Sequence, residues 1–191
     1  MLSARGDTDP VTPVDSFGLL TGVVIEVPAA EPAVGQLRHQ QDPRAVEGLP
    51  AYITVLSPFR PAHRLDPPVH EQLATIAASR AAFAFDLVRV GWFGNQTLWL
   101  APQDDRPFHE LTAELWRVFP DCPPYGGQFA EVVPHLTVAD GAPVAAMRRA
   151  AEQLGAQLPI TCAATALSLF EQARPGGWRR TARFALGLAL T

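Results

Sequence analysis

Two short segments, one in each half of the chain, carry polar side chains in the same arrangement. In each, an aromatic ring, an aliphatic residue, a threonine and a valine follow one another, beginning at Tyr52 and at His135. In a β-strand, residues i and i+2 point to the same side, so Tyr52 projects beside Thr54. By the same geometry His135 projects beside Thr137, which places an imidazole next to a hydroxyl. This pair suits phosphate chemistry, because the hydroxyl donates a hydrogen bond to a phosphate oxygen while the imidazole transfers a proton.

Each of these segments is followed by a predicted helix, which indicates that the two halves are structural copies. Packing the halves about a pseudo-twofold axis brings the four polar side chains to one cleft. The same residues also have plainer interpretations. Threonine is favoured in strands, His135 can make structural hydrogen bonds, and Tyr52 can fill space as an aromatic ring.

The elements that must position these residues alternate along the chain. β-branched runs that end at proline or glycine predict strands, and apolar residues at helical spacing predict amphipathic helices. Strands are expected at residues 19–27, 51–57, 83–90, 96–101, 134–138, 159–171 and 179–190. Helices are expected at residues 31–41, 67–82, 107–119 and 143–155. Such alternation with short connections predicts an α/β or α+β protein.

The two segments and their surroundings resemble the 2H phosphoesterase superfamily, specifically its 2′-5′ RNA ligase-like (cyclic phosphodiesterase) branch. The resemblance covers residues 18–190 and is most specific from Pro123 to Ala139, with residues 48–59 nearly as recognisable. It implies an α+β, bilobal fold with two antiparallel sheets, flanking helices and pseudo-twofold symmetry around a central groove. We expect residues 18–191 to form this single domain, after an N-terminal tail of residues 1–17.

The family's chemistry is metal-independent hydrolysis or formation of phosphodiesters, typically at RNA 2′,3′-cyclic phosphates or 2′-5′ linkages. Its members carry two His-x-Thr/Ser motifs, whose histidines act as general acid and base and whose hydroxyls hold the phosphate. Carried over to this chain, the resemblance assigns proton transfer to His135 and phosphate binding to Thr54 and Thr137. Tyr52 takes the position of the first motif histidine. The resemblance implies neither a cofactor nor a metal.

Two residues depart from the family pattern. The phenol of Tyr52 has an ordinary pKa near 10, so it is a poor base at neutral pH, although it can donate a hydrogen bond or a proton. Loss of one acid–base group typically costs roughly 10²–10⁴-fold in rate. Asp140 stands where relatives often carry a basic residue, and a carboxylate there repels a phosphodiester. The chain can therefore be a one-histidine phosphoesterase, a repurposed enzyme that uses Tyr52 and His135 on a small metabolite, or a non-catalytic module that binds a nucleotide or an RNA end.

Aromatic and arginine residues near the predicted groove offer further contacts. Trp178 and Arg179 belong to an arginine-rich stretch that can stack on a base and contact phosphate, although the charged ends of a hairpin look the same. Trp92 and Phe93, beside the turn at Gly94, can line the groove or pack in the core. We expect Trp178 and Arg179 to bind substrate together with the two threonines.

Composition narrows the class of partner. The chain has 191 residues, and its fifteen basic residues, all arginine, are outnumbered by nineteen acidic ones, for a net charge of −4. A broad nucleic-acid surface needs excess positive charge, so the expected partner is a small phosphorylated ligand, a nucleotide, an RNA end or another metabolite.

The remaining signals predict an ordinary cytoplasmic protein. The first residues contain no apolar stretch of the kind found in signal peptides, and no run of eighteen apolar residues predicts a membrane span. Cys122 and Cys162 lack the spacing of a zinc or redox motif. The histidines outside the motifs likewise lack metal-ligand spacing.

Overall fold

Strands rich in buried apolar residues build two antiparallel sheets in the structure, a computed structural model that describes residues 20–173 and 176–188. The strands are β1 (Thr21–Glu26), β2 (Tyr52–Leu56), β3 (Phe83–Phe93), β4 (Thr97–Pro102), β5 (Leu136–Asp140), β6 (Ile160–Ala164), β7 (Ala166–Gln172) and β8 (Trp178–Ala185). One sheet has the order β2–β1–β7–β8 and the other has the order β5–β4–β3–β6. The α+β class with two antiparallel sheets is therefore confirmed. The predicted tail lies outside the described residues.

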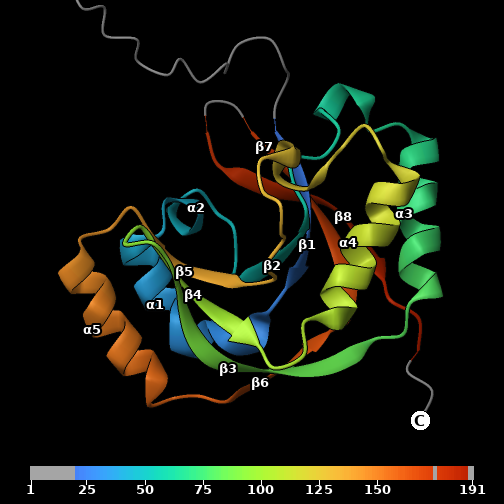
Figure 1. Ribbon diagram of the computed structural model, residues 1–191. Helices are drawn as coiled ribbons and strands as arrows, with labels where there is room; N and C mark the ends of the chain where they lie inside the picture. Colours follow the sequence, from blue (N-terminus) through green and yellow to red (C-terminus); the bar gives the residue numbers. More distant parts are fainter. Residues whose placement is uncertain (1–19, 174–175, 189–191) are drawn as a thin grey trace, which may run out of the picture.

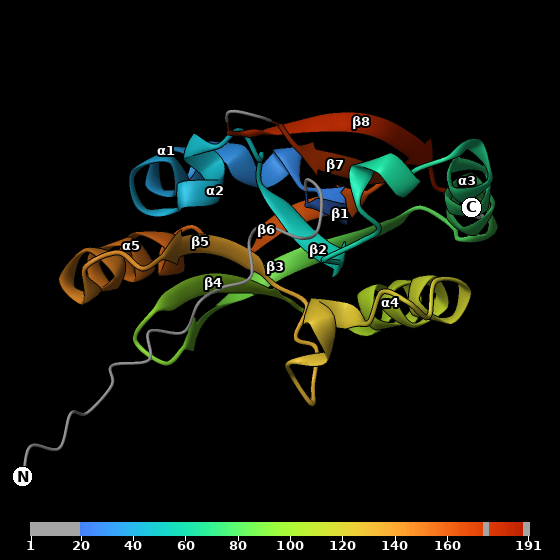
Figure 2. The ribbon, with the colours of Figure 1, turned by 90° about the horizontal axis from the view of Figure 1, so that it is seen from above.

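Helices cover both ends of the paired sheets. They are α1 (Glu31–Gln41), α2 (Pro43–Val46), α3 (Pro67–Ser79), α4 (Arg106–Val118) and α5 (Val144–Gly155), with short 3₁₀ turns η1 (Pro28–Ala30), η2 (Ala62–Arg64) and η3 (Pro124–Gly127). α1, α2 and α5 lie at one end and α3 and α4 at the other (Figure 1). Viewed from above, β7 and β8 lie in one layer and β3 and β4 in the other (Figure 2).

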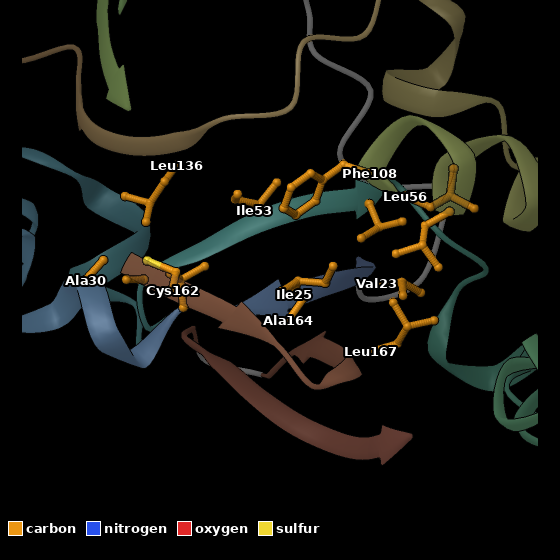
Figure 3. Packing of buried hydrophobic residues seen from close by; sticks show 14 of the residues in the cluster. Val23, Ile25, Ala30, Ile53, Leu56, Phe108, Leu136, Cys162, Ala164 and Leu167 are labelled. Carbon is orange, nitrogen blue, oxygen red and sulfur yellow. The ribbon is translucent and has the colours of Figure 1, made fainter. Parts of the chain in front are cut away.

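A single apolar cluster joins the two sheets. Ile53 of β2 and Leu136 of β5 are fully buried in it (Figure 3). Because side chains alternate along a strand, burial of Ile53 sends its neighbours Tyr52 and Thr54 to the opposite face. The core thus fixes the direction of the polar side chains on both motif strands.

α3 shows why the chain begins and ends its helices where it does. Asp66 caps the first turn by accepting a hydrogen bond from the Val69 amide at 3.1 Å, as the Asp-Pro sequence predicts. The helix ends at Ser79, three residues earlier than expected. There the Gly187 amide donates to the Arg80 carbonyl at 2.7 Å, and a Cβ on Gly187 would lie 2.7 Å from the Ala78 carbonyl oxygen.

The expected long strand over residues 159–171 is wrong. The chain instead forms β6 and β7, which belong to different sheets. The break falls at Thr165, whose carbonyl accepts from the Leu186 amide at 2.9 Å rather than from a strand partner. A continuous apolar run cannot reveal this crossing, because both strands bury residues in the same core. The strand expected at residues 134–138 also begins later, at Leu136, so His135 precedes β5.

Candidate functional site

A cavity of about 500 Å³ lies where the two motif segments meet. β2 and β5 are edge strands of the two sheets and contact each other. The side chains that line the cavity come from both: Tyr52, Thr54, His135 and Thr137. The structure therefore brings together the four polar residues on which the sequence analysis concentrated.

His135 is held as a neutral imidazole. Its Nδ1 lies 2.6 Å from the Val133 carbonyl oxygen, which can only accept, so Nδ1 carries the proton and Nε2 keeps a lone pair. Burial lowers the pKa of His135 below its usual 6.5, and the hydrogen bond to Val133 opposes this only in part. The rings of Phe93 and Trp99 pack against the imidazole, with centroids at 4.9 and 5.7 Å. This arrangement leaves a base ready at neutral pH.

Tyr52 faces the cavity as a neutral phenol. Burial, followed by the negative charge of Asp42, raises the pKa of Tyr52 to about 12. The phenol therefore cannot act as a base near neutrality, but it can donate to a ligand oxygen. Among the residues that the structure describes, its hydroxyl has no hydrogen-bond partner within the protein, so this donor is available to a ligand.

A buried arginine beneath Tyr52 was missed by the sequence analysis. Arg38, only 1% exposed, donates to the Thr137 carbonyl at 3.0 Å, to the Leu49 carbonyl at 3.3 Å and to the Asp42 carboxylate at 2.9 Å. Its guanidinium also lies 5.5 Å from the Tyr52 ring centroid. Arg38 therefore joins α1 to the backbone of the second motif segment and to that of Leu49, three residues before the first. Burial raises the pKa of the Asp42 carboxyl, and the adjacent guanidinium opposes this rise.

Replacing Arg38 with alanine should strongly destabilise the fold. The change leaves the Asp42 carboxylate and two backbone carbonyls buried without their donor. Loss of one partner of a buried ion pair typically lowers the free energy of unfolding by about 3–5 kcal/mol. Chemical denaturation of Arg38→Ala measures this loss. Arg106→Ala removes an exposed pair with Asp104 as a control and should leave the free energy of unfolding nearly unchanged. Equal, small losses in both variants would contradict the structural role of Arg38.

Tyr125 is a second lining residue that the sequence analysis did not select. It lies in η3 with φ 51° and ψ 31°, a left-handed conformation that is unusual for a residue with a side chain. Its amide donates to the Ser57 carbonyl at 2.7 Å, which fixes the loop next to the end of β2. Burial raises the pKa of Tyr125, with a smaller opposite effect from the Thr54 hydroxyl. The preceding run of prolines and following glycines was the available signal for this loop.

Trp178 and Arg179 do not line the cavity. The Trp178 indole donates to the Glu47 carboxylate at 3.1 Å and packs near the Arg44 guanidinium, 5.8 Å from the ring. Arg179 is exposed and pairs with Glu171 at 3.2 Å. Trp178 therefore packs beside Arg44, which does line the cavity, and we leave both Trp178 and Arg179 out of the proposed site. Of the aromatic pair at the turn, Phe93 lines the cavity whereas Trp92 packs against the core.

The described residues contain no group of three or more histidine, cysteine, aspartate or glutamate side chains that could hold a metal ion. Within the same part of the chain, no helix is both long and apolar enough to cross a membrane.

Comparisons with known proteins identify one matching family and several solved structures with a similar fold. A model of the 2'-5' RNA ligase superfamily matches residues 26–176. Escherichia coli LigT, solved in complex with 3′-AMP, is 18% identical with a TM-score of 0.56, covering 88% of this chain and 98% of LigT. The protein TT0787 of Thermus thermophilus is 16% identical with a TM-score of 0.59, covering 90% of this chain and 100% of TT0787.

A structure described as a phosphoesterase is 17% identical with a TM-score of 0.53, covering 88% of this chain and 99% of its own. No curated protein matches the sequence. At these identities the solved structures establish a shared fold.

Proposed function

The chain belongs to the 2'-5' RNA ligase superfamily, and from this premise we propose that its cavity opens 2′,3′-cyclic phosphates of nucleotides with one histidine as the base. The observation that carries the proposal is the hydrogen bond from His135 Nδ1 to the Val133 carbonyl. It places the proton of the neutral ring on Nδ1 and leaves the lone pair on Nε2, in a cavity that also presents the hydroxyls of Tyr52, Thr54 and Thr137. Membership of the superfamily supports a 2H phosphoesterase-like function, and the assignment of these roles is our own.

The reaction divides between the two motif segments. His135 Nε2 takes a proton from water, whose oxygen forms a bond to phosphorus. Thr54 and Thr137 donate hydrogen bonds to the non-bridging phosphate oxygens, where negative charge increases in the transition state. The bond from phosphorus to one ribose oxygen breaks, and Tyr52 donates a proton to that oxygen. Proton exchange through solvent then restores the phenol and the neutral imidazole, and the product is a nucleoside monophosphate.

The pH dependence of kcat/KM should show one ionisation, on the acid side. His135 must be deprotonated to act as the base, and its pKa is below 6.5, so activity should fall only as the pH drops under that value. Tyr52 has a pKa of about 12, so no loss is expected on the alkaline side up to about pH 10. A pH–rate profile with 2′,3′-cyclic AMP measures both limbs. A bell-shaped profile that declines above neutrality would show that a second titrating group shares the chemistry.

A second candidate is acid–base chemistry on a small uncharged metabolite. The observation that favours it is the presence of three carboxylates in the cavity lining, from Asp42, Glu131 and Asp140. Thermal unfolding with 3′-AMP separates the two candidates, because a ligand that binds only the folded state raises the melting temperature. A rise that the His135→Asn and Thr137→Val variants lose supports a phosphate site, and no rise at any concentration supports the uncharged ligand.

A further inference from the structure

The mouth of the proposed site is acidic. Glu131 and Asp140, which we call the acidic rim, are both exposed and both line the cavity. Asp140 lies at the end of β5 and accepts a hydrogen bond from the Thr97 hydroxyl at 2.9 Å, so its carboxylate is held in place. Two negatively charged side chains therefore line the same cavity as His135.

The nearby arginines do not balance this rim. Arg38 lies beneath Tyr52 and is paired with Asp42 at 2.9 Å. Arg44 is the one arginine among the lining residues that the structure describes, and it is paired with Glu47 at 3.3 Å. Both guanidinium groups are thus paired with carboxylates outside the acidic rim. Within the described part of the chain, Glu131 and Asp140 form no ion pair.

The rest of the lining suits a flat, uncharged ring. Phe93 and Tyr125 contribute aromatic side chains, and Phe129, which is 61% exposed, packs edge-on against Tyr125 at 5.6 Å. Aromatic faces bind nucleobases by stacking, without regard to charge. The rim carboxylates accept hydrogen bonds from amino groups, which nucleobases also carry.

We infer, on the basis of the proposed phosphodiester function, that this cavity selects substrates whose only negative charge is the reacting phosphodiester. The substrate class is a cyclic phosphate of a single nucleoside. A 5′-phosphorylated nucleotide or the end of an RNA chain brings further phosphates to the acidic rim and is repelled by it. The selectivity is therefore set by Glu131 and Asp140, whereas the chemistry belongs to His135.

The test compares kcat/KM for three substrates: 2′,3′-cyclic AMP, the same nucleotide with an added 5′-phosphate, and a short oligonucleotide that ends in a cyclic phosphate. We expect kcat/KM for 2′,3′-cyclic AMP to exceed kcat/KM for the other two substrates by about fivefold or more at low salt. This ratio should decrease as added salt screens the charges. The double variant Glu131→Gln, Asp140→Asn should decrease the ratio of kcat/KM values in the same way. The Asp140→Asn side chain still accepts the Thr97 hydrogen bond, so the local structure is preserved.

Glu71→Gln is the matched control, because it removes one exposed negative charge on α3, outside the cavity lining. It should leave the ratio of the three substrates unchanged. Equal kcat/KM for all three substrates in the wild type, or a preference that the rim variants do not alter, would overturn the inference while leaving the proposed function intact. Absence of turnover with every substrate would overturn the proposed function, and the inference with it.

Discussion

Replacement of Tyr52 by histidine should raise turnover of 2′,3′-cyclic AMP by roughly 10²-fold, at the lower end of the range that a second acid–base group provides. The phenol of Tyr52, with its pKa of about 12, is a weak proton donor at neutral pH. An imidazole on β2 would face His135 across the cavity and could protonate the leaving oxygen directly. Steady-state kinetics of the two proteins measure the gain.

Tyr52→Phe is the matched control, because it changes the same position and removes only the hydroxyl. Phenylalanine keeps the ring that lies over the Arg38 guanidinium but removes the donor. It should lower kcat below that of the wild type and leave stability nearly unchanged. If Tyr52→His is no faster than Tyr52→Phe, then position 52 takes no part in proton transfer and the two-sided mechanism is wrong.

The second large effect is expected at His135. Asparagine there retains a side chain that can donate to the Val133 carbonyl, but it cannot take a proton from water. kcat/KM for 2′,3′-cyclic AMP should fall by roughly 10²–10⁴-fold. His109→Asn, on the exposed surface of α4, is the matched control and should retain full activity. A His135→Asn protein that folds and retains more than about a tenth of wild-type activity would remove the base from the mechanism.

Local patterns were sufficient to predict the elements that carry the site. The period of two along a strand predicted that Tyr52 and Thr54 share one face of β2, and Asp66 and Pro67 predicted the start of α3. These features depend on nearest neighbours along the chain. The departures from the family pattern at Tyr52 and Asp140 stay predictions, because they rest on the resemblance alone.

The features that the sequence did not predict depend on tertiary contacts. Arg38 follows Leu37 near the end of an ordinary amphipathic helix, where an arginine is normally exposed. Its burial results from packing of α1 against the backbone of Thr137, a residue distant in sequence. The high pKa of Tyr52 has the same origin, since burial and Asp42 raise it only in the folded chain.

Residues in irregular segments were also difficult to assign. Tyr125 reaches the cavity through a left-handed backbone conformation that its residue type disfavours. Trp178 and Arg179 show the opposite case, because an arginine–tryptophan cluster resembles a ligand site until its partners in the fold are known. In the fold the carboxylates of Glu47 and Glu171 pair with them.

The most direct test of His135 as the base is hydrolysis of 2′,3′-cyclic AMP in ¹⁸O-labelled water, followed by mass spectrometry of the product. We expect the wild-type protein to form adenosine monophosphate with one ¹⁸O in its phosphate, and the His135→Asn protein to form almost none. An unchanged cyclic phosphate with the wild-type protein, or equal labelled product with both proteins, would contradict the proposal that His135 activates water in this cavity.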